Sequence, residues 1–573
     1  MKFYVEIIKP SHYDDDGYLI QWFRPFISSN TLACLYALVD DARRRCVLGQ
    51  DLEIVPNAYD ECQRVIPTSK IIRRINPPLG RRSPPAESAR FAAMRPDPAA
   101  LRDVGHRADW CGGVVFLAGV QTNQIPRAIE LAREFRRSGV QVVIGGFHVS
   151  GCFAMLRESP TLHSYGDGAL PPDIKELQAL GVSIFLGEAE GRMADLLVDA
   201  HRGMLRPVYN YLGDPPDLRG QPTPFLPAHV ARRYSFFGTF DAGRGCPFQC
   251  SFCTVINVQG HESRFRDADD IEKLVRANVD RGIRRLFITD DNMARNKNWE
   301  AIFDRLIALH DNEGIRLKLT LQVDTLAHKI PRFVDKARRA GCNRVFLGLE
   351  SINPQNLAAV GKLHNHVEEY RDALSAWRSH KAITYAGYIL GFPADSPESI
   401  ERDIETIKRE LPIDILEFVI LTPLPGCADH QRLYEQKAWL EPDLNKYDLE
   451  HVTFRHGRMT DEQLQAIYHR AWELFYSLDH IETIMQRAKT NGAGVCHVTD
   501  AILSYYGSYR FEHLHPLQSG ILRRKVRPCC SIRVACGKPF PPTPHLSASG
   551  SSWNASENAC AADAAGAEVF CDL

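Results

Sequence analysis

The 573 residues of the chain are enough for about two to four domains. With 44% hydrophobic and 24% charged residues, the composition is that of an ordinary globular protein. The formal net charge is -1, so the charge balance gives no support for a nucleic-acid partner.

No segment has the composition of a membrane span or of a secretory signal. A span needs an apolar run of about 18 residues, and none occurs. The first six residues lack the long apolar segment of a signal peptide. The 16 Cys are scattered except for one short cluster, a pattern that does not indicate a disulfide framework. We therefore expect a cytoplasmic protein.

Residues 1–205 alternate between short apolar runs and helical patterns. Strands are expected at residues 3–8, 52–55, 113–119, 141–146 and 182–186, with helices at 30–39, after 125 and from about 192. Residues 73–105 are rich in Pro and Arg and predict an insertion. Strands that alternate with helices predict a parallel, doubly wound sheet. This region should form a Rossmann-type domain of α/β class.

Two glycines close one of these strands. Gly145 and Gly146 follow the apolar run 142–144, and His148 comes two residues later. Ligands of doubly wound sheets bind at the carboxyl ends of the strands. Glycine permits close approach of a bulky ligand to the backbone there. The sequence therefore places a candidate ligand site at this strand end.

A Pro-rich linker at 221–224 separates this domain from a second one, expected at 232–427. Its strands are expected at 236–240, 286–288, 317–323, 344–349, 384–390 and 415–421, with helical patterns between them. Six such units predict a partial (β/α)6 barrel of the TIM type, whose chemistry lies on the loops after the strands. Polar or turn residues occur there at Asp290, Asp291, Asn292, Gln322, Glu350, Ser351 and Pro425. Helix caps and ordinary turns are the alternative interpretation.

Three cysteines follow the first strand of the barrel. Cys246, Cys250 and Cys253 are spaced C-x3-C-x2-C. Thiolates select zinc, copper(I) or iron–sulfur clusters. A structural zinc site normally has four ligands, and His261 lies eight residues past the last Cys, which fits poorly. A cubane cluster held by three thiolates keeps one iron open for another ligand. Three unrelated buried cysteines remain the alternative.

This loop, with Phe252 directly before its third Cys, resembles the signature of the radical S-adenosylmethionine (SAM) superfamily. The resemblance implies a [4Fe–4S] cluster on Cys246, Cys250 and Cys253. It also implies that SAM chelates the fourth iron and is cleaved to a 5′-deoxyadenosyl radical. By the same resemblance, the SAM-binding residues are Phe252, Asp290, Asp291, Asn292, Gln322, Glu350, Ser351 and Pro425.

The first domain resembles the cobalamin-binding domain of one subgroup of that superfamily. The segments that carry the resemblance are residues 143–150 and Gly187-Glu188-Ala189-Glu190. It implies that Gly145, Gly146 and His148 lie at bound cobalamin. The D-x-H-x-x-G motif that supplies a cobalt ligand elsewhere is absent, so cobalamin would bind without that histidine. A flavodoxin-like domain that binds nothing is the alternative.

The remainder divides into two parts. Residues 428–526 predict a helical region. Residues 527–573 are of low complexity and predict a disordered tail, whose five Cys have no cluster-like spacing.

The function implied is that of a radical SAM enzyme that functionalises an unactivated carbon, with cobalamin-dependent methyl transfer as the leading hypothesis. A cobalamin-independent oxidation or cyclisation is the second hypothesis, and an iron–sulfur electron carrier or sensor is the third. The implied partners are a small-molecule or lipid-like substrate and an electron donor such as flavodoxin or ferredoxin. No individual catalytic residue can be named.

Overall fold

A computed structural model of the chain describes residues 1–77, 112–156, 170–234, 238–492 and 494–527. Most of the predicted insertion at 73–105 and nearly all of the predicted tail lie outside these ranges. Residues 73–75 are described and complete helix α2 (Thr68–Ile75), so the insertion was predicted to begin too early. Within the described ranges, no helix is both long and apolar enough to cross a membrane.

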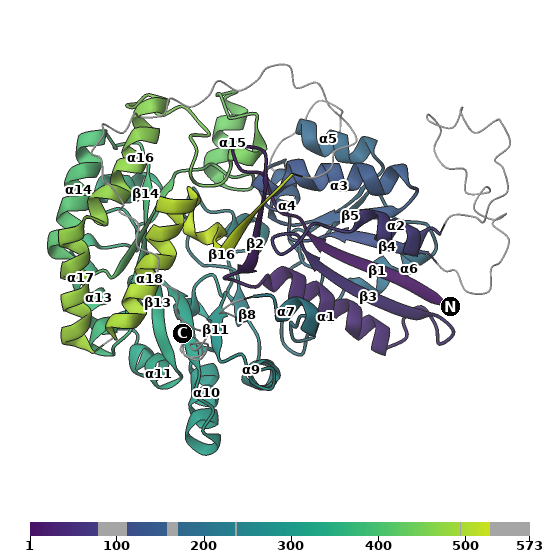
Figure 1. The fold of residues 1–573 in the computed structure, drawn as a ribbon, viewed down its shortest axis with the longest axis horizontal. Helices are drawn as coiled ribbons and strands as arrows, with labels where there is room; N and C mark the ends of the chain where they lie inside the picture. Colours follow the sequence, from purple (N-terminus) through teal and green to yellow (C-terminus); the bar gives the residue numbers. More distant parts are fainter. Residues whose placement is uncertain (78–111, 157–169, 235–237, 493, 528–573) are drawn as a thin grey trace, which may run out of the picture. The chain divides into compact units, whose positions relative to one another are not determined.

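The first sheet has six parallel strands in the order β3-β1-β4-β5-β6-β7. Figure 1 labels the first four of them, β3, β1, β4 and β5, side by side. Their bounds are β1 (Lys2–Lys9), β3 (Glu53–Asp60), β4 (Gly113–Leu117), β5 (Gln141–Gly145), β6 (Ser183–Leu186) and β7 (Val208–Asn210). The chain moves outward from β1 in both directions, which confirms the doubly wound prediction. β7 was not predicted and extends the sheet past residue 205.

Helices cover both faces of this sheet because its strands are apolar on both sides. In β4, Val114 and Phe116 pack with α1 (Asn30–Arg44) and α6 (Met193–His201). Val115 and Leu117 pack on the other face. The helices there are α2, α3 (Ile125–Arg137), α4 (Phe147–Leu156) and α5 (Pro172–Ala179).

The second sheet also has six parallel strands, in the order β15-β14-β13-β12-β11-β8. The bounds are β8 (Gly238–Phe240), β11 (Arg285–Ile288), β12 (Lys318–Val323), β13 (Cys342–Glu350), β14 (Ile383–Leu390) and β15 (Ile415–Ile420). Spatial order follows chain order, as in a barrel left open between its first and last strands. The predicted partial barrel is confirmed.

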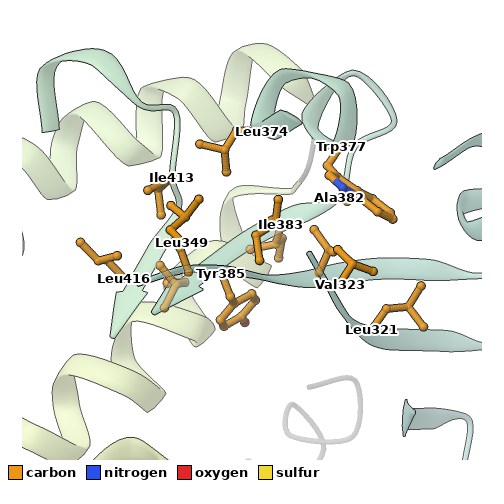
Figure 2. Packing of buried hydrophobic residues seen from close by; sticks show 14 of the residues in the cluster. Leu321, Val323, Leu349, Leu374, Trp377, Ala382, Ile383, Tyr385, Ile413 and Leu416 are labelled. Carbon is orange, nitrogen blue, oxygen red and sulfur yellow. The ribbon is translucent and has the colours of Figure 1, made fainter. Parts of the chain in front are cut away.

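Helices connect successive strands of the second sheet and pack on it. They are α9 (Ala268–Val279), α10 (Trp299–Glu313), α11 (Phe333–Arg339), α12 (Pro354–Ala359), α13 (Tyr370–Ser379) and α14 (Pro397–Glu410). Figure 2 shows part of this core, where Leu374 and Trp377 of α13 lie beside Ile383. α14 begins at a capping box, in which the Ser396 hydroxyl accepts from the Ser399 amide.

Short elements flank the barrel strands. They are α7 (Ala228–Ala231), α8 (Val255–Val258), and the paired strands β9 (Gly243–Arg244) and β10 (Arg264–Phe265). The predicted helical region contains α15 (Ala428–Glu435), α16 (Asp461–Phe475), α17 (Leu478–Asn491) and α18 (Val495–Gly507). It ends differently from the prediction, because β16 (Gly520–Val526) pairs antiparallel with β2 (Leu19–Pro25).

Helix α4 of the first sheet lies against the loop that follows β15 of the second. A Cβ atom on Gly151 would lie 2.0 Å from the Pro425 carbonyl oxygen and 3.0 Å from the Gly426 nitrogen. Real Cβ contacts do not approach this closely, so only glycine permits the two backbones to meet here. The loop after the last barrel strand therefore depends on a glycine in the first domain.

Gly151→Ala should lower the apparent unfolding temperature of the anaerobic protein. Alanine alone favours a helix by about 1 kcal/mol, whereas forcing a methyl group into a closed contact costs about 1–3 kcal/mol. The matched control is Gly457→Ala, where a Cβ would meet nothing within 4 Å. Equal unfolding temperatures for the two variants, measured by scanning calorimetry, would contradict this contact.

Candidate active site

The three-cysteine loop lies between β9 and α8, at the carboxyl end of the barrel. It is held from both sides. The Gly245 amide donates to Asp291 Oδ2 at 2.9 Å, and the Ser251 amide donates to the Val360 carbonyl at 2.9 Å. Gly245 has φ of +90°, a conformation that favours glycine. Barrel elements far apart in the sequence therefore fix the loop.

The three thiols of the loop suit a cluster better than a single ion. Their three sulfurs do not all lie within 4.8 Å of one another. Among the described residues, only the side chains of His148, Cys152 and Asp173 form a group that close. A cluster spreads its ligands more widely than one metal atom does. Burial raises the pKa of Cys246 to about 11 and that of Cys253 to about 12, so both thiols keep their protons until a metal replaces them.

The acidic residues after β11 face inward rather than toward solvent. Asp290 is fully buried and accepts from Asn296 Nδ2 at 2.7 Å, while Asn292 donates to Asp324 at 2.9 Å. Burial raises the pKa of Asp290 to about 7 and that of Asp291 to about 6. Asp291 supports the cysteine loop directly through the Gly245 amide. Asp290 is bound within its own loop, and Asn292 is joined to the loop after β12.

Glu350, at the end of β13, forms an ion pair that the sequence did not reveal. Lys362 Nζ lies 2.8 Å from Glu350 Oε1 and 5.8 Å from the centroid of the Phe252 ring. Burial lowers the pKa of Lys362, but Glu350 and Cys250 outweigh burial and raise it, so the amine stays charged. The buried, charged amine of Lys362 therefore lies close enough to Cys250 and Cys253 to interact with them electrostatically.

The remaining predicted SAM contacts lie on the same end of the barrel. Phe252 packs with Phe392, whose ring centroid is 6.0 Å away. Gln322 is half-buried on β12, and buried Ser351 accepts from the Asn353 amide. Pro425 follows β15 and meets α4, as described above. The structure thus brings all the predicted residues to the strand ends.

Glu417 is a further carboxyl group in the barrel, from the middle of β15. Its side chain is buried, and Oε2 has no hydrogen-bond partner among the described residues. Burial, with a smaller contribution from Glu350, raises the pKa of Glu417 to about 8. It is therefore neutral over most of the physiological range and can donate a hydrogen bond. Neither periodicity nor spacing in the sequence indicates a functional role for this residue.

A cavity of about 170 Å³ opens at the carboxyl edge of the first sheet. Gly145 and Gly146 of the predicted ligand site line it, together with Gly187. Arg244 and Val258, which flank the cysteine loop, close the other side. The cavity therefore joins the strand ends of the first sheet to the loop of the second.

The structure gives Gly146 a packing role in addition to its place at the cavity. A Cβ on Gly146 would lie 2.2 Å from the Val120 nitrogen, so this glycine permits close packing against the loop that follows β4. His148 does not line the cavity. It is buried beside Thr122 and Asp173, and its Nε2 is 2.7 Å from Asp173 Oδ2. Burial lowers the pKa of His148, but Cys152 and Asp173 outweigh it and raise the pKa to about 10.

A network of buried ion pairs spans the cavity. Arg244 contacts Glu188 at 2.6 Å, Glu190 at 2.7 Å and Asp241 at 3.0 Å, and its side chain is 11% exposed. Arg264 also contacts Glu188. Burial raises the pKa of Asp241, but Arg244 outweighs it with help from Arg266, and the pKa falls to about 2. The Gly-Glu-Ala-Glu segment of the first sheet thus binds the arginine that precedes the cysteine loop.

Comparisons with known proteins agree with this architecture. Residues 242–407 match the family model described as the Radical SAM superfamily. Bacteriochlorophyllide d C-12(1)-methyltransferase of Chlorobaculum tepidum is 27% identical over 62% of this chain and 73% of its own length. The solved structure of the cobalamin-dependent S-adenosylmethionine radical enzyme OxsB, with aqua-cobalamin and S-adenosylmethionine, has a TM-score of 0.54 at 13% identity. The match covers 88% of this chain and 72% of that one.

A second solved structure has the same fold. The radical S-adenosylmethionine methyltransferase TsrM from Kitasatospora setae, with cobalamin and a [4Fe–4S] cluster, has a TM-score of 0.51 at 16% identity. The match covers 76% of this chain and 78% of that one.

A parallel partial barrel with three cysteines after its first strand defines a radical SAM core. Residues 242–407 carry a radical SAM domain, and the protein is an enzyme, as the sequence predicted. The superfamily's cofactors, a [4Fe–4S] cluster and SAM, are therefore those of this protein.

Arg244→Ala should destabilise the protein strongly, because it leaves buried carboxylates without their cation, a loss of about 3–5 kcal/mol. The matched control is Arg219→Ala, whose ion pair with Asp217 is 56% exposed on both sides and should matter little. Apparent unfolding temperatures measure the difference.

The destabilisation caused by Arg244→Ala should be larger near neutral pH than in acid. The lowered pKa of Asp241 stabilises the wild type above the unfolded pKa of about 3.9, and this stability is lost as pH falls toward the folded pKa of about 2. The gap between wild type and Arg244→Ala should therefore be widest near neutral pH and shrink in acid. A gap independent of pH would contradict the assignment.

Proposed function

We propose that the protein is a cobalamin-dependent radical SAM enzyme that transfers a methyl group to an unactivated carbon. The observation that carries this proposal is the cavity shared by Gly145 of the first sheet and Arg244 of the loop region. Ligands of such sheets bind at this edge, and the cavity opens toward the cysteine loop. We assign cobalamin to residues 1–205 and the cluster and SAM to residues 232–427.

Cys246, Cys250 and Cys253 would hold the cluster. The donor set fits, because three thiols on one short loop leave one iron of a cubane without a protein ligand. Burial raises the pKa of Cys250, and the buried positive charge of Lys362 beside this set partly offsets that rise. When bound, the cluster supplies the electron that cleaves SAM.

SAM would lie over the strand ends of the barrel. Glu350 and Lys362 form a charged pair there that can interact with the amino and carboxylate groups of SAM. Phe252 and Phe392 offer an apolar surface for adenine. Asp290, Asp291, Asn292, Gln322, Ser351 and Pro425 complete the proposed set.

The substrate would bind in the interior of the barrel. Neutral Glu417 offers a hydrogen-bond donor to a substrate oxygen or nitrogen. Four of the relatives are named as methyltransferases or methylases of bacteriochlorophyllides and hopanoids, and another is named as the methyltransferase of a pantetheinyl carbapenam carboxylate. A small-molecule or lipid-like substrate follows as the proposal for this chain.

We also propose a cytoplasmic location with a low-potential electron donor such as flavodoxin or ferredoxin. The ten described cysteines form no disulfide, in keeping with a reducing compartment.

Replacing all three loop cysteines by alanine should abolish iron binding and SAM cleavage. Anaerobically reconstituted wild type should contain about four irons per chain. The reduced protein should also convert SAM slowly to 5′-deoxyadenosine. The matched control is Cys342→Ala, a buried thiol at the start of β13. A triple variant that keeps its iron would refute the assignment.

Cobalamin should bind to the full chain without a histidine ligand to cobalt. His148 is engaged with Thr122 and Asp173 and does not line the cavity. Electron paramagnetic resonance of the Co(II) state should then be free of nitrogen splitting from histidine, and His148→Ala should leave the spectrum unchanged.

One result would count against the ligation prediction, and another against the proposed methyl transfer. Nitrogen splitting that His148→Ala removes would contradict the ligation prediction alone. Absence of cobalamin binding in folded, iron-loaded protein would overturn the methyl-transfer proposal and favour oxidation or cyclisation by the same radical SAM core.

A further inference from the structure

Three ligand side chains meet in the first domain, on a side of α4 that does not face the cavity. His148 and Cys152 are four residues apart on α4, so they share one face of the helix. Asp173 comes from the first turn of α5. One nitrogen, one sulfur and one oxygen atom of these residues all lie within 4.8 Å of one another. Among the described residues this is the one such group.

The distances within the group converge on one ring nitrogen. His148 Nε2 is 2.7 Å from Asp173 Oδ2 and 3.6 Å from Cys152 Sγ. In a tetrahedral zinc site, neighbouring ligand atoms are about 3.3–3.8 Å apart, as bond lengths of about 2.0–2.3 Å require. The distance to Cys152 already falls in that range, and a shift of Asp173 by about 0.6 Å would bring the distance to His148 into it. The third distance, between Cys152 and Asp173, is no more than 4.8 Å.

The other ring nitrogen has its own partner. His148 Nδ1 lies 3.1 Å from the hydroxyl of buried Thr122. Ligating histidines commonly use their second nitrogen in this way, which fixes the ring and directs the lone pair at the metal. The supporting contact that a metal-binding histidine needs is thus already in place.

The surroundings favour a cation at this point. His148 and Cys152 are each 2% exposed, and the Asp173 side chain is 12% exposed. A carboxylate can only accept hydrogen bonds, and so can the lone pair of the facing nitrogen. These groups need either a proton or a metal ion between them. Burial makes an unbalanced charge there costly.

We propose that His148, Cys152 and Asp173 bind one Zn²⁺ ion, with water as the fourth ligand. A thiolate, an imidazole and a carboxylate form a ligand set that zinc accepts. Binding releases the thiol proton and any proton on the imidazole. The site is separate from the cysteine loop and does not depend on the proposed methyl transfer.

The position of the site gives it a mechanical role. Phe147 and Ser150 on the same helix line the cavity, and Gly151 meets Pro425. An ion that joins α4 to α5 would fix the helix that carries these contacts. We expect zinc to raise the unfolding temperature, because it binds the folded arrangement only.

The test uses the full chain with its reconstituted cluster, equilibrated with zinc sulfate and then desalted. Wild type should retain about one zinc per chain. Cys152→Ser and Asp173→Asn should each lose it, while the matched control Cys342→Ser, also a buried thiol, should keep it. Iron content, which should be equal in all four proteins, reports that each variant is folded.

A second measurement identifies the ligands directly. X-ray absorption at the zinc edge, which iron does not obscure, should show one sulfur at about 2.3 Å and nitrogen or oxygen at about 2.0 Å. Wild type without zinc would overturn the proposal and leave a histidine–aspartate ion pair beside an ordinary buried thiol. Zinc retained by both Cys152→Ser and Asp173→Asn would also overturn it, because the ion would then lie elsewhere.

Discussion

The joining of the two sheets depends on the charge balance around Arg244. One guanidinium binds carboxylates from the end of the first sheet and from the barrel strand that leads to the cysteine loop. Buried charges persist only when they are paired and hydrogen-bonded. The loop that holds the thiols is therefore set in place by an electrostatic condition that both sheets must satisfy together. A change on either side alone leaves a charge buried without a partner.

The layered fold could be predicted because its signals are local. Short apolar runs that alternate with helical patterns predict two parallel α/β sheets, because such runs are joined by crossover helices. The pairing of β2 with β16 could not be predicted. Its partners, such as Trp22 and Arg523, lie at opposite ends of the chain, and no local pattern joins them. β7, with only three residues, is too short to produce a periodicity.

The residues of the candidate site also fall into those with a local sequence signal and those without one. The cysteine spacing and the polar strand ends are visible in the sequence, because chemistry and position coincide there. Lys362 and Glu417 are not, since a lysine after a short helix and a glutamate inside a strand resemble surface residues until burial is known. His148 was assigned to the ligand cavity by its distance from Gly146 along the chain. A helix turns neighbouring side chains about 100° apart, so this residue faces another way.

The β2–β16 pair also constrains how the protein emerges from the ribosome. At roughly 5–20 residues per second, the first sheet can form long before residues 520–526 exist. During that interval β2 is an unpaired edge with apolar side chains, including Trp22, that are buried in the finished protein. Nascent chains of this enzyme therefore expose an unpaired, aggregation-prone strand for most of their synthesis. Chaperones that shield exposed strands would act on it until the last strand arrives.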